Sequence, residues 1–117
     1  MLYRFLILAV LLAGLAACAP VTMNGDLVSG EGDALGSAQV VASDIRGLRM
    51  YTVKAQLPDE TVFSGEMKYG AKSVTLFDDN GVSMNCRFVL KDPVKSFHGG
   101  GTGECEISDG QKLKVRF

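Results

Sequence analysis

GECEISDGQKLKVRF, residues 103–117, carries the clearest strand–turn–strand pattern of the chain. Small or apolar side chains alternate with acidic ones up to Ile107, and apolar ones alternate with basic ones from Lys112 to Phe117. A period of two predicts two half-buried β-strands, and Asp109-Gly110 between them predicts a tight turn. The outward positions of this hairpin then bring opposite charges side by side, as Glu104 and Glu106 against Lys112, Lys114 and Arg116.

The same alternation runs through the chain upstream of this hairpin. Val82–Leu90 places Met84, Cys86 and Phe88 on one face, and the Asn80-Gly81 pair before it is a strong hairpin signal. Earlier strands are expected over residues 38–45, 51–57 and 63–69 and around Val74 and Leu76, and no helix is indicated after residue 18. The sequence therefore predicts an all-β fold, a small antiparallel β-sandwich or barrel of about six strands.

The first 17 residues have the features of a cleaved export signal, expected as a helix before cleavage. Arg4 supplies a positive charge, and the apolar run that follows is about 13 residues long, too short for a membrane-spanning helix of about 20. Leu15-Ala16-Ala17-Cys18 closes the run and resembles the lipobox of bacterial lipoproteins, which is an aliphatic residue, two small residues and a cysteine. The resemblance implies cleavage before Cys18, a diacylglycerol on its sulfur and acylation of the new amino terminus.

The resemblance also implies a location. In Gram-negative lipoproteins an aspartate after the cysteine often signals retention at the inner membrane, and Ala19 stands there instead. We therefore expect an outer-membrane lipoprotein, anchored through its lipid, with its body on the periplasmic face.

Three regions follow from this: a signal peptide at 1–17, a lipidated amino terminus with a flexible tether at 18–37, and a β-domain at 38–117. The tether is expected because residues 19–37 are rich in Gly, Ser and acids and show no sustained period. The chain has 12 Lys and Arg against 13 Asp and Glu, and losing Arg4 leaves a net charge of about −2. That balance argues against a nucleic-acid binder, which would be strongly basic.

Cys86 and Cys105 remain as a pair once Cys18 is assigned to lipid. An even pair in an oxidising compartment predicts a disulfide, and both residues share the inward parity of their strands. The alternatives were a zinc site with His98 or a redox-active pair. Neither C-x₂₋₄-C nor C-x-x-C spacing is present, so the sequence favours the disulfide and gives no metal or cofactor site.

Phe97, His98, Gly99, Gly100 and Gly101 form the candidate binding loop, expected to be a long flexible connection. A catalytic interpretation would pair His98 with Ser96 or Ser73 and with Asp92 as orienting acid, but no G-x-S-x-G or H-E-x-x-H motif supports it. The glycines lack the Lys-Ser/Thr and the helix that follow in a phosphate loop.

A basic outer face is a further candidate surface. It would draw on Arg87, Lys91 and Lys95 together with the basic residues of the last strand, and it would contact anionic envelope polymer or lipid headgroups. The simpler interpretation is a solvated face that Glu104 and Glu106 neutralise.

The function expected from the sequence is a lipid-anchored envelope protein with a non-catalytic binding or structural role. It would meet an envelope protein or polymer through a sheet face, an unpaired strand edge or the 91–103 loop. The alternative is a small-ligand carrier or enzyme with a site near His98. The glycine and cysteine pattern from Cys86 to Phe117 also resembles small, glycine-rich envelope proteins, a resemblance that carries no functional residues.

Overall fold

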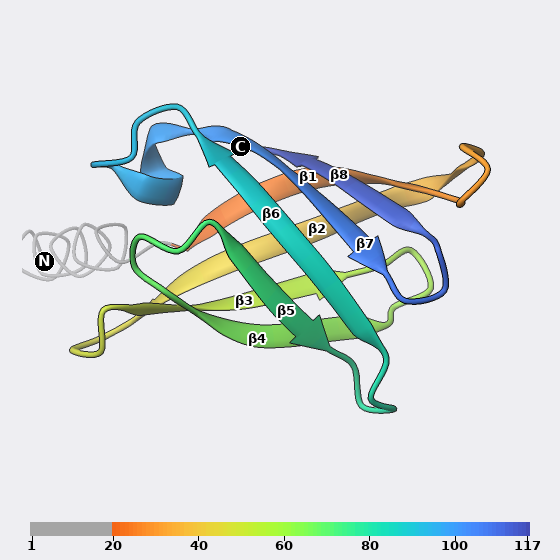
Figure 1. Cartoon of the computed structure of the whole chain (residues 1–117), viewed down its shortest axis with the longest axis horizontal. Coiled ribbons are helices and arrows are strands. Elements are labelled where there is room, and N and C mark those ends of the chain that lie inside the picture. The colour runs from red at the N-terminus through yellow and green to blue at the C-terminus, as the bar shows by residue number, and fades with distance from the viewer. Residues whose placement is uncertain (1–19) are drawn as a thin grey trace, which may run out of the picture.

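The computed structural model describes residues 20–117 as a closed barrel of antiparallel strands (Figure 1). Each strand pairs with the next along the chain, and β1 also pairs with β8. The elements are β1 (Val21–Val28), β2 (Ala34–Ile45), β3 (Met50–Gln56), β4 (Val62–Lys68), β5 (Ser73–Phe77), β6 (Ser83–Leu90), the 3-10 turn η1 (Ser96–Gly99), β7 (Gly101–Ile107) and β8 (Lys112–Arg116). The all-β, antiparallel prediction is confirmed, with eight strands in place of about six.

One strand that the sequence did not reveal, β1, comes from the segment that was expected to be a tether, and β2 begins in the same segment, four residues before the strand expected at 38–45. Met23 and Leu27 point into the core on β1, and Gly25 lies between them where a Cβ would come within 2.9 Å of the Leu113 and Val115 side chains. The three inward positions of β1 are therefore Met23, Gly25 and Leu27. Because the middle one has no side chain, the alternation of apolar and polar residues cannot be recognised in the sequence. The prediction of a flexible tether over 18–37 is wrong for residues 21–37, because β1 and the start of β2 belong to the barrel.

The barrel closes through its first and last strands. β1 runs antiparallel to β8, with Gly25 opposite Val115 and Leu27 opposite Leu113. The first and last strands therefore satisfy each other, and within residues 20–117 the sheet has no free terminal strand. The weakest seam lies between β4 and β5, which share the single register pair Ser64 with Phe77, so the unpaired strand edge considered from the sequence can only lie there.

The interior is filled by the side chains that the alternation placed inward. Val53 on β3, Leu76 on β5, Met84 on β6 and Leu113 on β8 are completely buried. Within residues 20–117 no polar or charged residue is buried. An apolar interior enclosed by polar outward positions is the arrangement of a small barrel whose lumen is packed with side chains.

The predicted hairpins are present, although their turns differ in detail. Asp78 and Val82 face each other through an N–H to carbonyl bond of 3.1 Å, and Gly81 adopts the left-handed conformation with φ of 82°. Asn80 does not adopt positive φ, as it would in the two-residue type I′ turn typical of an Asn-Gly pair. The bond between Asp78 and Val82 instead encloses three residues, 79–81. Ile107 and Gln111 close the last hairpin in the same way, with Gly110 at φ 98°.

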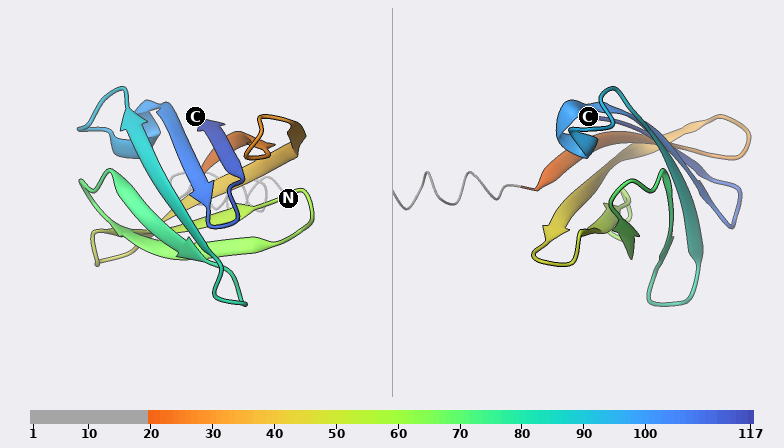
Figure 2. Two further views of the ribbon diagram at one scale, coloured as in Figure 1. Left: turned by 45° about the vertical axis from the view of Figure 1, so that its right-hand side comes forward. Right: turned by 60° about the vertical axis from the view of Figure 1, so that its left-hand side comes forward.

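Consecutive connections of the meander alternate between the two ends of the barrel (Figures 1 and 2). The end at which β1 begins, called the amino end here, carries the connections 46–49, 69–72 and 91–100 and also the last residue, Phe117. The opposite end, called the far end, carries 29–33, 57–61, 78–82 and 108–111. Within residues 20–117, no helix is long and apolar enough to cross a membrane.

Candidate functional site

An aromatic cluster closes the barrel at its amino end. Phe97 of η1 is 1% exposed and its ring centroid lies 5.0 Å from that of Tyr51, 5.1 Å from Phe88 and 5.6 Å from Phe117. The contacts with Tyr51 and Phe88 are edge-to-face, at 81° and 90°, a favourable geometry for aromatic pairs. Phe97 therefore belongs to the core, and the single 3-10 turn around it serves to insert this ring.

The rest of the candidate binding loop is held close to the barrel. A Cβ on Gly101 would lie 2.3 Å from the carbonyl oxygen of Val89, and one on Gly99 would lie 3.1 Å from the Cβ of Asp92. The Gly100 carbonyl accepts the N–H of Lys91 at 3.0 Å. The glycines are thus required by close packing. The connection is long, as expected, and it packs against the barrel. Of the five loop residues, His98 is the exposed one.

The groups proposed around His98 do not form a connected set. Ser73 lies at the start of β5 opposite Arg87, and the Asp92 carboxylate accepts the backbone N–H of Val94 at 3.0 Å. Among the side-chain hydrogen bonds of residues 20–117, none joins His98 to Ser96, Ser73 or Asp92. The same part of the chain holds no group of three His, Cys, Asp or Glu side chains placed to bind a metal ion.

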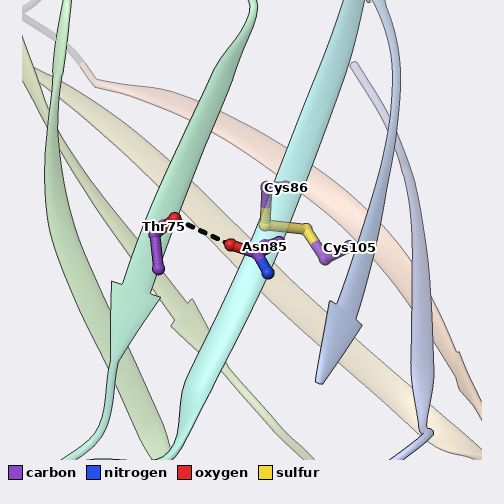
Figure 3. Close-up of a disulfide and its surroundings, with 4 residues drawn as sticks. All are labelled: Thr75, Asn85, Cys86 and Cys105. Atoms are coloured by element: carbon purple, nitrogen blue, oxygen red, sulfur yellow. Dashed lines mark hydrogen bonds between the residues drawn. A yellow bond between two sulfur atoms is a disulfide. The ribbon is translucent and has the colours of Figure 1, made fainter. Parts of the chain in front are cut away.

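The predicted disulfide is present between β6 and β7 (Figure 3). Cys86 and Cys105 lie directly opposite each other in the strand register and both are buried. On the outer surface beside them, Thr75 Oγ1 donates a hydrogen bond of 2.7 Å to Asn85 Oδ1 and links β5 to β6. The bond between the two sulfurs leaves neither free to act as a metal ligand.

The outer surface of β5 to β8 forms an open depression, lined by polar and charged side chains together with apolar groups such as the exposed Val89. Glu104 lies between Arg87 on β6 and Lys114 on β8, and Glu106 lies opposite Lys112. This register confirms that acids and bases of the last hairpin are neighbours. The basic face expected from the sequence is therefore largely balanced where it lies on the barrel wall.

Arg116 forms an ion pair with an aspartate on β1. Its Nη1 lies 3.3 Å from Oδ2 of Asp26, with both side chains more than half exposed. Lys91 and Lys95 are not part of this wall, because they lie in the 91–100 connection at the amino end.

The connections at the two ends of the barrel carry opposite charge, a feature that sequence reasoning missed. At the far end, every charged residue in the connections is acidic. The members are Glu31, Asp33, Asp59, Glu60, Asp78, Asp79 and Asp109. At the amino end the connections carry Arg46, Arg49, Lys72, Lys91 and Lys95.

The separation of acidic far-end connections from basic amino-end connections has few exceptions. In the amino-end connections the acid is Asp92, and nearby Asp44 on β2 accepts a hydrogen bond from the Tyr69 hydroxyl. At the far end the backbone N–H of Thr61 donates a hydrogen bond to Asp59, which lowers the pKa of that carboxyl. The barrel is thus a charge-polarised body with a nearly neutral wall.

Cys18, the predicted site of lipidation, lies outside the described residues, as does the whole signal segment at 1–17. No protein-family model, curated protein or solved structure matches this chain. The functional argument therefore depends on the residues themselves.

Proposed function

We propose that this chain is a lipid-anchored envelope protein with a non-catalytic binding or structural role. The acyl chains would be carried by Cys18, and the barrel would lie at the periplasmic face of the outer membrane. An envelope protein or polymer would be the partner, without nucleic acid and without a cofactor. The Leu15-Ala16-Ala17-Cys18 motif supports the anchor, and Ala19 in place of an acid supports the outer membrane.

The observation that carries the non-catalytic role is the apolar, filled interior. Phe97 occupies the amino end of the barrel, and no polar group of residues 20–117 is buried where it could act on an enclosed ligand. Small-molecule sites are concave and combine apolar walls with a few converging polar groups. The polar groups of this barrel lie on its wall and its ends, where they suit contact with another surface.

The alternative of a ligand carrier or an enzyme near His98 has less support. It would need a concavity at the 91–100 connection, and Phe97 and the glycines pack into that region. Its test is activity or ligand binding that is lost in His98→Ala while the fold is retained. Such a loss would replace the proposed function with the alternative.

Membrane fractionation of wild type and Cys18→Ser tests the anchor. Wild type should sediment with outer membranes and require detergent for release, because two or three acyl chains hold a protein far more firmly than one. Cys18→Ser should be released from membranes or remain unprocessed. Processed Cys18→Ser that stays on membranes would contradict the proposal.

Ala19→Asp is the matched control for this experiment. It keeps Cys18 and should be acylated and processed normally, but the acid should retain the protein at the inner membrane.

The binding role is tested separately by cross-linking in cells. A defined cross-linked partner at native expression is expected, and recovery of monomer alone would count against a binding role.

A further inference from the structure

We propose that the amino end of the barrel lies against an anionic bilayer surface, with Leu48 and Val94 in the headgroup region and the acidic far end directed away. This inference rests on the proposed function, because it takes the anchor at Cys18 as given. It adds an orientation and a lipid-binding surface that acylation alone does not require.

The first argument is the length of chain between the anchor and the barrel. Cys18 is three residues from Val21, where β1 begins, so even a fully extended chain spans only about 10 Å. β1 begins at the amino end, beside the connections 46–49, 69–72 and 91–100 (Figure 1). An anchored barrel therefore holds this end near the lipid.

The second argument is charge. Arg46, Arg49, Lys72, Lys91 and Lys95 are all exposed on the amino-end connections. A gap of about 10 Å is comparable with the Debye length at physiological ionic strength, so anionic headgroups would attract these side chains. The acidic far end would be repelled by the same surface. Although the mature chain carries a slight negative charge, its polarity favours one orientation.

The third argument is the exposed apolar residues interleaved with these charges. Leu48 is 61% exposed between Arg46 and Arg49, and Val94 is 94% exposed between Lys91 and Lys95. An isolated apolar side chain on a surface is ordinary. Leu48 and Val94, however, both lie on basic connections at the end of the barrel nearest the anchor. Cationic and apolar groups mixed in this way are typical of surfaces that bind at a membrane interface.

The connections that carry these residues are bound to the barrel and to each other. The backbone N–H of Tyr69 donates to the Arg49 carbonyl at 3.0 Å, and the N–H of Phe88 donates to the Lys72 carbonyl at 2.8 Å. Phe97 fixes the 91–100 connection from within. The basic and apolar groups therefore form a preorganised surface, which lowers the cost of binding.

Tryptophan probes on a tethered barrel test this orientation. Residues 20–117 contain the eight strands of the closed barrel and its apolar core, so we expect this segment to fold without the residues that precede it. An amino-terminal hexahistidine tag on nickel-chelating lipid replaces the acyl anchor. The chain has no Trp, so Leu48→Trp reports on the amino end, and Val62→Trp, at an exposed apolar site of the far end, is its matched control.

On phosphatidylcholine vesicles that contain phosphatidylglycerol, the Leu48→Trp emission should shift to the blue and be quenched by brominated lipid. The Val62→Trp emission should stay that of a water-exposed indole. Added salt, or vesicles of phosphatidylcholine alone, should weaken the first signal. If both probes remain in water, or both respond equally, the orientation is refuted.

Charge reversal identifies the surface responsible. Arg46→Glu with Lys72→Glu should abolish the Leu48→Trp response, whereas Lys54→Glu with Lys112→Glu makes the same change in net charge on the barrel wall and should preserve it. Equal loss in both variants would show that overall charge, and no oriented surface, is responsible. Because the tag replaces the anchor, none of these results depends on whether Cys18 is acylated in the cell.

Discussion

Phe97 of η1 stands edge-on to Phe88 of β6, with ring centroids 5.1 Å apart and ring planes at 90°. Phe97 lies within the 91–100 connection, which was expected to be flexible, and this contact makes its ring part of the core. The glycines that follow serve the same packing, since Gly101 and Gly103 allow β7 to lie close to Val89 and Phe88.

Phe97→Ala should lower the free energy of unfolding by about 3–5 kcal/mol, the usual cost of removing a fully buried aromatic ring. Urea unfolding followed by circular dichroism measures it. Phe77→Ala removes the same ring where it is 53% exposed and should cost much less. Equal losses in the two variants would mean that Phe97 does not fill the amino end.

Cys86→Ala with Cys105→Ala should lower the free energy of unfolding by about 3 kcal/mol. The cysteines are 19 residues apart, and the chain-entropy model gives a value of this size for a loop of that length. Thermal unfolding with and without a reducing agent is the measurement. The reductant should lower the Tm of wild type and leave the double variant unchanged; a wild type that is insensitive to full reduction would contradict the assignment.

Gly65→Val should destabilise the barrel by about 1–3 kcal/mol, as expected for overpacking. β4 and β5 share the single register pair Ser64 with Phe77, and a Cβ on Gly65 would lie 2.7 Å from the Thr75 carbonyl oxygen. The added side chain would force these strands apart. Ser64→Val, at an exposed outward position, is the control and should be nearly neutral; comparable Tm values for both variants would argue against the close approach at Gly65.

Asp26→Asn should change the free energy of unfolding by less than about 1 kcal/mol. The carboxylate pairs with Arg116, but both side chains are well exposed, and such pairs contribute little. Urea unfolding at low and high salt is the measurement. A larger loss would mean that the β1–β8 closure depends on this ion pair more than on its backbone bonds and on Leu27 and Leu113.

The strands from β3 to β8 could be predicted because their inward positions are apolar and their outward positions polar. β1 could not, because Gly25 occupies an inward position where neighbouring side chains leave no room for a Cβ. The same ambiguity affected the 91–103 segment, where glycines that permit close packing resemble glycines of a mobile loop. In β1 and in the 91–103 segment, glycine stands where an apolar side chain would have shown the alternation of inward and outward residues.

The charge separation was hidden for a different reason. Acidic and basic connections alternate along the chain, so the total charge of −1 and any local average look balanced. The signal was present in the order of the turns, from the acidic 29–33 to the basic 46–49 and then the acidic 57–61. An up-and-down meander sorts such turns to opposite ends, so the polarity becomes visible once the topology is known.

Mass spectrometry of the native protein extracted from membranes decides whether the barrel is lipid-anchored, because it identifies the first residue and whatever is attached to it. We expect a chain that begins at Cys18 and carries fatty acids on its sulfur and its amino group. A chain that begins at another residue, or a Cys18 without fatty acid, would contradict this expectation.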